Sequence, residues 1–285
     1  MIERIDPWVH NKRVLLLGFG REGQSTWQVL KQLGTCACVD IADQKPAAVD
    51  ADGARWITGD HYQNCLDDYD VVFKSPGIVL ERPIESYRCA ILSQAELFFH
   101  LFRDQIIGIT GTKGKSTTTS LLYHVLKSAG QECVVMGNIG IPAFDHLEEI
   151  GPDTRIVFEL SCHQLEYMTV SPHIGVLINI HEEHLDHYGT MEKYVAAKHR
   201  IFRNQDSDDI LVCNMQCLPE PGECPSRLIR VGTNCPDADV NVDNCGENGT
   251  FVDYGGSRYR IPETEIRLLG QHNYFDIAVV YAVCG

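Results

Sequence analysis

Short runs of apolar residues alternate with longer amphipathic segments along most of the chain. The short runs suit buried strands, and the longer segments, some of which end at a glycine, suit helices. The predicted strands cover residues 13–18, 36–40, 70–74, 105–109, 156–160, 175–180 and 209–213. The predicted helices cover residues 25–33, 94–102, 116–129, 190–202 and 272–284. This alternation favours an α/β fold in which helices cover both faces of a parallel sheet.

One region departs from the alternation. Residues 214–262 are rich in Gly, Pro, Asn and Asp, so we expect loops and short antiparallel strands there. A new strand–loop–helix unit begins near residue 105, after the helix at 94–102. At about 150 residues per domain, the 285 residues suggest two domains, which we place at 1–98 and 99–285.

The composition of the chain limits which binding partners and which cellular compartment we expect. The net charge of −15 repels nucleic acid and anionic membrane, so we expect neither as a partner. The first residues lack an apolar signal core, and no apolar run approaches the roughly 20 residues of a membrane span. Twelve cysteines are far too few for a disulfide scaffold of this length. The sequence therefore predicts a cytoplasmic protein with reduced thiols.

The loop after the first predicted strand carries the pattern G-x-G-x-x-G, from Gly18 to Gly23. Such glycines let the backbone approach a pyrophosphate, and an acid at the end of the next strand can bind a ribose hydroxyl. Asp40, which we expect to end that strand, is the candidate acid. The pattern alone leaves three possibilities open: NAD, another nucleotide diphosphate, or a tight turn that binds no ligand.

A second glycine-rich loop precedes the helix at 116–129. Its core, G-x-x-G-K-S from Gly111 to Ser116, belongs to the phosphate-binding P-loop, although Ile109 stands where the full pattern requires glycine. Backbone N–H groups would surround the phosphates, Lys115 would reach the terminal ones, and the Ser116 hydroxyl would hold Mg²⁺. The sequence therefore predicts a nucleotide-triphosphate site here.

Further side chains offer metal or thiol chemistry. Glu159 lies in an apolar run, where a carboxylate is costly unless it is paired or bound to metal, and a P-loop site needs such an acid on a neighbouring strand. Cys162 and His163 are adjacent, and on a strand they would point to opposite faces, which argues against a thiol–imidazole pair. The segment from His181 to His187 is dense in metal ligands, which leaves a metallo-hydrolase open beside a solvated charged loop. A structural zinc site is only weakly indicated, since no C-x-x-C pair occurs among Cys213, Cys217, Cys224, Cys235 and Cys245.

Together these motifs resemble the Mur ligase family of peptidoglycan synthesis over nearly all of the chain. The similarity is greatest to the D-glutamate-adding members, because of the run Gly137-Asn138-Ile139-Gly140 and the run Glu159-Leu160-Ser161 with Gln164-Leu165-Glu166. The other markers are residues 109–117, Asn179, His184, Asp186, 196–198 and 269–273. The resemblance implies a Rossmann-like domain for a UDP-linked substrate, followed by a P-loop central domain that binds ATP.

The resemblance also implies an activity. ATP would phosphorylate the carboxylate of UDP-N-acetylmuramoyl-L-alanine, and D-glutamate would attack the resulting acyl phosphate to form an amide. We expect a monomer that uses ATP and two Mg²⁺ ions. An NAD-binding oxidoreductase, a metallo-hydrolase and another Mur-type ligase remain the alternatives.

The family's functional residues transfer to positions that match its motifs. The resemblance assigns catalytic roles to Lys115, His184 and Lys198. It places the metal ligands at Ser116, Glu159, His184 and Lys198, the last after carbamylation. ATP would contact Gly111, Thr112, Lys113, Gly114, Lys115, Ser116, Thr117 and Asn273, the last near the adenine. The UDP substrate would contact Gly18, Phe19, Gly20, Arg21, Asp40, Ser75, Pro76, Gly77, Asn138, Ser161 and Gln164.

Some positions depart from the family pattern. Cys162-His163 stands where Ser-Phe is usual, and Lys113 adds a cation to the phosphate loop. Ile41-Ala42 follows Asp40 where Thr-Arg can occur, and Asp276 stands where a second Asn is expected. The family's C-terminal domain, which binds the incoming amino acid, has no counterpart in the 285 residues. We therefore expect a fragment that binds the UDP substrate and does not complete ligation.

Overall fold

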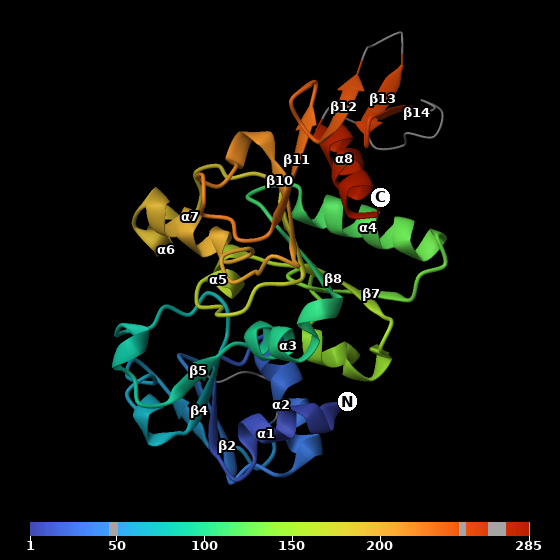
Figure 1. Cartoon of the computed structure of the whole chain (residues 1–285). Helices are drawn as coiled ribbons and strands as arrows, with labels where there is room; N and C mark the ends of the chain where they lie inside the picture. The colour runs from blue at the N-terminus through green and yellow to red at the C-terminus, as the bar shows by residue number, and fades with distance from the viewer. Residues whose placement is uncertain (46–50, 245–248, 262–271, 285) are drawn as a thin grey trace. The chain divides into compact units, whose positions relative to one another are not determined.

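The computed structural model describes residues 1–45, 51–244, 249–261 and 272–284, and it divides into two compact units (Figure 1). Unit 1 comprises residues 1–102 and 136–152, and unit 2 comprises residues 103–135 and 153–285. The predicted boundary at 98 falls inside helix α3 (Gln94–Phe102), all of which belongs to unit 1. The side chain of Gln94 accepts a hydrogen bond from the Ala143 amide at 2.9 Å, which ties the returning segment into this unit.

Unit 1 is built on a parallel sheet. In its described residues five strands are hydrogen-bonded in the order β3-β2-β1-β4-β5. They are β1 (Arg13–Leu17), β2 (Cys38–Asp43), β3 (Trp56–Thr58), β4 (Val71–Lys74) and β5 (Ala90–Leu92). The helices besides α3 are α1 (Asp6–Val9) and α2 (Arg21–Leu33). Residues Val14 to Leu17 of the central strand are fully buried, as expected for an apolar strand in a parallel sheet.

A second, larger sheet forms the frame of unit 2. Its described strands follow the order β14-β13-β12-β11-β10-β9-β6-β8-β7. On one side of the phosphate loop's strand β6 (Ile106–Thr110) lie β8 (Arg155–Glu159) and β7 (Cys133–Gly137). On the other side lie β9 (Ile174–Leu177), β10 (Ile210–Asn214), β11 (Arg227–Thr233), β12 (Val240–Asn244), β13 (Thr250–Tyr254) and β14 (Ser257–Ile261).

The strand directions correct one prediction. Strands β6 and β8 to β12 pair in parallel, whereas the pairs β12–β13 and β13–β14 are antiparallel. The expected short antiparallel strands within residues 214–262 are therefore confirmed for β13 and β14 and wrong for β11. The composition of that region is typical of its loops, whereas β11 is an apolar, half-buried strand that extends the parallel sheet.

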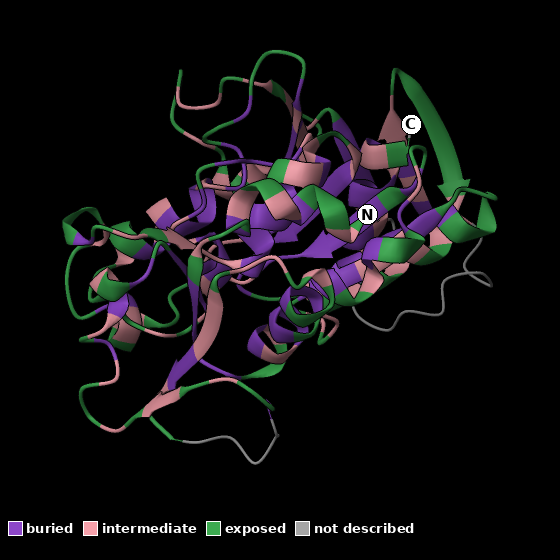
Figure 2. Ribbon diagram, turned by 90° about the horizontal axis from the view of Figure 1, so that it is seen from below, coloured by how far each residue is buried: buried purple, intermediate pink, exposed green. Residues whose placement is uncertain are grey.

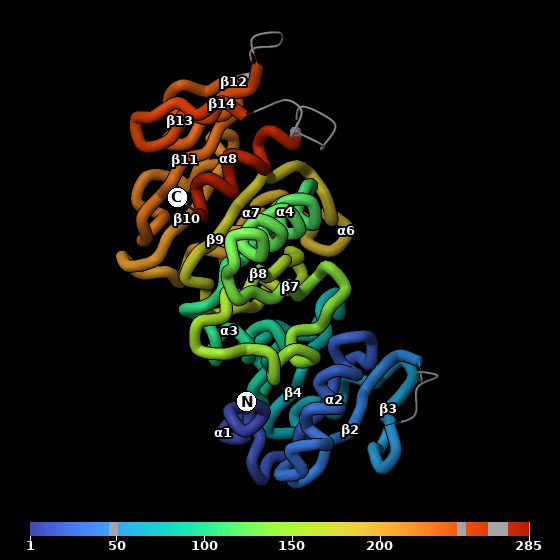
Figure 3. The backbone as a smooth tube through the Cα atoms, turned by 90° about the vertical axis from the view of Figure 1, so that its right-hand side faces the viewer, coloured from blue at the N-terminus to red at the C-terminus, as the bar shows by residue number. Residues whose placement is uncertain are grey.

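The described helices of unit 2 are α4 (Lys115–Ser128), α5 (Cys162–Leu165), α6 (Leu185–Tyr188), α7 (Met191–His199) and α8 (His272–Cys284). Helix α4 packs on β6 and β8, whereas α5 and α6 pack against α7. Helix α8 packs against α4 and against β11 and β12, and the two helices run side by side in Figure 3. Leu122 of α4 and Ala278 of α8 share one buried cluster with sheet residues such as Val176, and Figure 2 shows buried residues concentrated in the strands. None of the helices in the described part of the chain has both the length and the apolar character needed to cross a bilayer.

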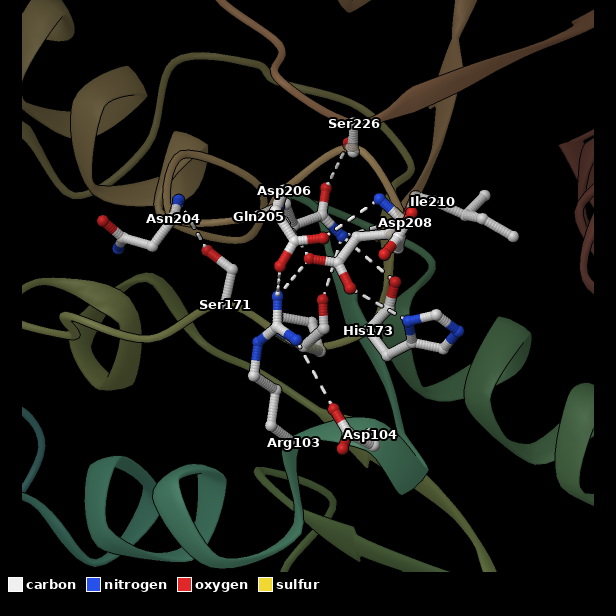
Figure 4. A network of polar contacts seen from close by, with 12 residues as sticks. Arg103, Asp104, Ser171, His173, Asn204, Gln205, Asp206, Asp208, Ile210 and Ser226 are labelled. Atoms are coloured by element: carbon white, nitrogen blue, oxygen red, sulfur yellow. Dashed lines mark hydrogen bonds and ion pairs between the residues drawn. The ribbon is translucent and has the colours of Figure 1, made fainter.

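A polar network ties three strands together where they begin (Figure 4). Asp209, which precedes β10 and is 1% exposed, accepts from the Arg103 guanidinium, which precedes β6, and from the amide of Asp206 at 2.8 Å. Its other oxygen lies 2.9 Å from Nδ1 of His173, which precedes β9. These residues lie at the N-terminal ends of the parallel strands, whereas the phosphate loop follows the C-terminal end of β6. The network therefore holds the end of the sheet opposite the phosphate loop.

The order of the strands places a ligand site. Strand β6 lies between β8 and β9, and the chain visits β7 and β8 on one side before it crosses to β9 on the other. Ligands of open parallel sheets bind at such a switch point, beyond the carboxyl ends of the strands. The loop after β6 lies at this point.

Candidate functional site

The glycine-rich loop follows a strand that is buried along its whole length. Strand β6 ends at Thr110, and helix α4 begins at Lys115, so the sequence-predicted strand–loop–helix context is confirmed. A Cβ atom added to Gly111 would lie 3.0 Å from Cβ of Ile178 on the neighbouring strand segment. Glycine fits here without crowding, because the loop lies directly against the chain that leaves β9.

Asn179 holds the loop from the adjacent strand end. Its Oδ1 accepts from the amides of Thr112 at 2.9 Å and Lys113 at 3.0 Å, and its Nδ2 donates to the Lys113 carbonyl at 3.0 Å. Sequence reasoning identified Asn179 only as a family marker and did not assign this role. Since two loop amides donate to Asn179, the N–H groups left for an anion are those at the start of α4, which have no partner within the helix.

Two lysine side chains converge on the loop. Nζ of Lys115 donates to the carbonyl oxygens of Gly111 and Thr112, each at 3.0 Å. Nζ of Lys198, from α7, donates to the same Gly111 oxygen at 2.8 Å, although Lys198 and Gly111 are 87 positions apart. Lys198 is 1% exposed, and its burial, with the nearby Lys115 charge as a smaller cause, lowers its pKa from 10.5 to about 8.

Tyr194 joins the loop to α7. Its hydroxyl lies 3.0 Å from Oγ1 of Thr112, and Nζ of Lys198 lies 4.9 Å from the centre of its ring. The ring of His184 is 6.3 Å from the Tyr194 ring, between centroids. Lys198 and His184, which the family resemblance placed at one metal site, thus both lie beside Tyr194.

Glu159 lies at the carboxyl end of the strand next to the loop. It pairs in register with Ile109 of β6, and its side chain is 1% exposed. Ser116 is exposed in the first turn of α4. A carboxylate and a hydroxyl are hard oxygen ligands of the type that Mg²⁺ prefers, so these two residue types fit that ion.

A cavity of about 660 Å³ opens beside the loop. Its walls include Lys113, Gly114 and Thr117, the strand ends at Asn179 and Asn214, and Phe275 with Asp276 of α8. Asp276 accepts a hydrogen bond from Thr118 of α4 at 2.5 Å, so this departure from the family pattern joins two helices. Asn273 is buried near the start of α8 and is not among the cavity's lining residues, so its contact with adenine stays a prediction. The marker residues 269–271 lie outside the described residues.

In unit 1 the first glycine-rich turn is fixed by two neighbouring strands. The amide of Gly18 donates to the Ala42 carbonyl at 2.8 Å, and Oγ of Ser75 donates to the Gly18 carbonyl at 3.1 Å. The turn of Ser75, Pro76 and Gly77 therefore lies against Gly18, as the predicted substrate site requires. Helix α2 begins directly after Gly20, so its predicted start at residue 25 is four residues late.

The acid predicted to end the second strand is not at its end. Strand β2 continues to Asp43, so the expectation that it stops at Asp40 is wrong. Asp40 accepts from the Tyr69 hydroxyl at 2.7 Å, whereas Asp43 accepts from the Phe19 amide at 2.8 Å. Ile41 and Ala42 are buried and continue the strand beyond Asp40. The polar Asp40 interrupts the apolar run, so the sequence pattern predicts that the strand ends there. Of these two carboxylates, Asp43 is therefore the one that contacts the glycine turn.

A second cavity, of about 360 Å³, lies within unit 1. It is lined by Phe19 and Arg21 at the start of α2 and by Gly140 and Pro142 from the returning segment. A Cβ atom added to Gly140 would lie 3.0 Å from the Arg21 guanidinium, so the Gly137–Gly140 loop and Arg21 are in contact. The structure thus brings together the two unit 1 motifs, 18–23 and 137–140, that sequence reasoning assigned to one substrate.

The remaining predicted residues lie on short helices of unit 2. Ser161 and Gln164 form a capping box, in which each side chain bonds the backbone amide of the other at the start of α5. Cys162 and His163 lie on this helix and not on a strand, which corrects the expectation that they point apart, since the Cys162 sulfur is 3.7 Å from Nδ1 of His163. His184 has a left-handed backbone (φ 55°), a conformation in which residues other than glycine are uncommon.

Few of the candidate metal ligands in residues 181–187 and 213–245 come together in the described part of the chain. Among the described residues, the group whose ligand atoms come within 4.8 Å of one another is Cys162, His163 and His184. Of the segment from His181 to His187, only His184 belongs to it. The described cysteines Cys213, Cys217, Cys224 and Cys235 do not belong to it, and Cys245 lies outside the described residues.

Comparison with known proteins identifies the class. Residues 109–284 match the family described as Mur ligase middle domain. UDP-N-acetylmuramoylalanine--D-glutamate ligase of Lacticaseibacillus casei is 40% identical over 225 residues, which are 75% of this chain and 49% of that protein. The enzyme of the same name from Geobacillus kaustophilus is 38% identical over 217 residues, which are 72% of this chain and 48% of that protein. The chain thus spans about half the length of these curated relatives.

Solved structures agree on the fold. The UDP-N-acetylmuramate:L-alanyl-gamma-D-glutamyl-meso-diaminopimelate ligase from Neisseria meningitides superposes with a TM-score of 0.59 at 18% identity, over 96% of this chain and 93% of that one. UDP-N-acetylmuramate-alanine ligase MurC from Thermotoga maritima gives a TM-score of 0.52 at 20% identity, over 95% of this chain and 64% of that one. The chain belongs to the Mur ligase family, and this membership replaces the oxidoreductase and metallo-hydrolase alternatives.

Proposed function

We propose that this chain provides the substrate-binding and ATP-binding parts of a cytoplasmic ligase that adds D-glutamate to UDP-N-acetylmuramoyl-L-alanine. The observation that carries the proposal is the phosphate loop, which Asn179 holds in place while Lys115 and Lys198 converge on its Gly111 carbonyl. The names of the two curated relatives support the choice of D-glutamate over the amino acids of sister ligases.

The loop's task is to hold negative charge. Transfer of the γ-phosphate of ATP to a carboxylate, and attack of an amine on the acyl phosphate, both concentrate charge on oxygen atoms. The N–H groups at the start of α4 and the ammonium group of Lys115 would receive the phosphates. For Lys115 this requires that Nζ leave the carbonyl oxygens of Gly111 and Thr112, to which it donates in this structure.

Magnesium would be held by the oxygen ligands around the loop. Ser116 and Glu159 fit one ion, which would neutralise charge on the phosphates when bound. A second ion is assigned to His184 and to Lys198 after carbamylation, since an unmodified ammonium group repels a cation. Carbamylation needs the neutral amine, and the low pKa of Lys198, about 8, supplies it near neutral pH.

The UDP-linked substrate is assigned to unit 1. The glycine turn at 18–20, the Arg21 guanidinium, the Ser75–Gly77 turn and Asn138 would hold its diphosphate and sugar. Arg21 is exposed at the start of α2 and lines the 360 Å³ cavity, so its charge is available to an anion. Ser161 and Gln164 stay assigned to this substrate as a prediction, although the capping box engages them here.

Ligand-dependent stability tests the proposal directly. The chain would be unfolded thermally with Mg-ATP, with UDP-N-acetylmuramoyl-L-alanine or with NAD in separate samples. A ligand at 100 times its dissociation constant stabilises the native state by about 2.7 kcal/mol. We expect stabilisation by the first two ligands and none by NAD. Stabilisation by NAD alone would overturn the proposal.

Two variants assign each ligand to its unit. Lys115→Ala should remove the effect of Mg-ATP and keep that of the UDP substrate, and Arg21→Ala should do the reverse. Both side chains are at least partly exposed, so neither change should unfold the chain. An equal loss of both effects in either variant would contradict the assignment.

A further inference from the structure

The segment Cys162-His163, which departs from the family pattern, lies in contact with His184. Ring centroids of His163 and His184 are 4.9 Å apart and the rings are nearly perpendicular, at 72°. The Cys162 sulfur lies 3.7 Å from Nδ1 of His163. One ligand atom from each of the three residues falls within 4.8 Å of the others.

The geometry is close to that of a bound transition metal. In a tetrahedral site with bonds of about 2.0–2.3 Å, ligand atoms lie about 3.5 Å apart. The three donors therefore need to approach by roughly 1 Å to close on an ion. The side chain of His184 is 41% exposed and can make this movement by rotating.

The donor set selects the kind of metal. A thiolate with two imidazoles suits zinc and other thiophilic ions, whereas Mg²⁺ prefers oxygen ligands. Three protein ligands leave one coordination position open to water or a small ligand. Access is available, because Cys162 is 3% exposed but His163 is half-buried and His184 faces solvent.

Neighbouring side chains pack against His163 and Cys162. His187 lies beside His163, at 4.6 Å between ring centroids, and its Nε2 is 3.0 Å from a carboxylate oxygen of Glu166. Tyr188 and Tyr194 pack with Cys162 in one buried cluster. Cys162 is therefore held in place by the packing of these tyrosines.

We propose that Cys162, His163 and His184 form a binding site for one Zn²⁺ ion. The proposal goes beyond the ligase function and does not depend on it, since binding is measured without nucleotide. The metal would bind through the Cys162 thiolate and one imidazole nitrogen from each histidine. Because the site includes His184, zinc would compete for the ring that the proposed function assigns to Mg²⁺.

Cobalt titration tests the site by spectroscopy. Co²⁺ added to the metal-free chain should give the visible bands of a tetrahedral ion and a near-ultraviolet sulfur-to-cobalt charge-transfer band. One equivalent of Zn²⁺ should remove both, and a large excess of Mg²⁺ should not. Cys162→Ser should abolish the charge-transfer band, and His163→Phe and His184→Ala should each weaken Co²⁺ binding at least ten-fold.

Matched controls separate the site from general effects. Cys133→Ser removes another buried thiol, and His146→Phe removes another half-buried imidazole, so both should bind Co²⁺ like the parent chain. If Cys162→Ser fails to fold, His184→Ala still tests the proposal because His184 is exposed. The absence of a charge-transfer band in the parent chain, or its persistence in Cys162→Ser, would overturn the proposal.

Discussion

Nζ of Lys115 and Nζ of Lys198 donate to the same backbone oxygen, that of Gly111, at 3.0 and 2.8 Å. Lys115 is the first residue of α4 and is partly exposed, whereas Lys198 reaches the loop from α7 and is buried. Burial disfavours the charged form of Lys198 most strongly, and the neighbouring Lys115 charge adds to this. Lys198 therefore loses its proton at a lower pH than an ordinary lysine does.

The pH dependence of stability should report the buried lysine. The pKa of Lys198 falls from 10.5 in the unfolded chain to about 8 in the folded one, so between these values the unfolded state binds more protons. Stability should rise with pH across that window by about 3 kcal/mol through this group, and the penalty is fully present below pH 8. Lys198→Met should remove this rise, which urea unfolding from pH 7 to 10 measures. An unchanged slope in the variant would contradict the pKa shift.

Carbamylation should follow from the same shift. In bicarbonate near pH 8 about half of the Lys198 side chains are neutral amines that can attack CO₂. We expect one carbamate carbon signal in the NMR spectrum of the chain under ¹³C-bicarbonate with Mg²⁺, and its loss in Lys198→Arg. A signal that persists in that variant would place the modification elsewhere.

Removal of the Asn179 side chain, which holds the phosphate loop, should affect stability and nucleotide binding together. Asn179→Ala removes the side-chain acceptor of the Thr112 and Lys113 amides, of which Thr112 keeps the Asn179 backbone carbonyl, so it should cost about 0.5–1.5 kcal/mol of unfolding free energy. The loosened loop should bind Mg-ATP at least ten-fold more weakly by calorimetry. Asn179→Asp keeps the acceptor but adds a charge, so it should retain most of the stability and still lose affinity. Unchanged Mg-ATP affinity in Asn179→Ala would show that the loop binds nucleotide without the Asn179 side chain.

The third glycine of the first motif should be needed for packing. A Cβ atom at Gly23 would lie 2.3 Å from the Gly18 carbonyl oxygen, whereas one at Gly20 would meet nothing within 4 Å. Gly23→Ala should therefore cost about 1–3 kcal/mol, and Gly20→Ala less than about 1 kcal/mol. All three tryptophans of the chain lie in unit 1, so their fluorescence during urea unfolding reports this difference. Equal costs for the two variants would refute the packing explanation.

The network at the opposite edge of the sheet should matter for stability alone. Asp209→Ala leaves the partly buried Arg103 without its main partner and should cost about 3–5 kcal/mol, measured by circular dichroism in urea. Asp206→Ala removes a carboxylate that is 64% exposed and should cost less than about 1 kcal/mol. Neither variant should change Mg-ATP affinity while the chain is folded. A loss of affinity in folded Asp209→Ala would link this edge to the site.

The sequence by itself determined the strand–loop–helix units and the chemistry of their loops. Apolar runs such as 106–110 form strands because burial on both faces of a parallel sheet demands them, and the G-x-x-G-K-S pattern is local to one turn. Glu159 was identified for a similar reason, since a carboxylate in an apolar strand signals a special environment. These signals lie within a few consecutive residues.

Tertiary structure decided which distant residues meet. Asn179 on the loop amides, Lys198 on the Gly111 carbonyl and His184 beside Cys162-His163 all come from separate strands and helices. Strand order and helix packing create these contacts, and no spacing rule in one sequence encodes them. The end of β2 at Asp43 and the parallel pairing of β11 were missed for the same reason, because neighbouring strands fix both through hydrogen bonds.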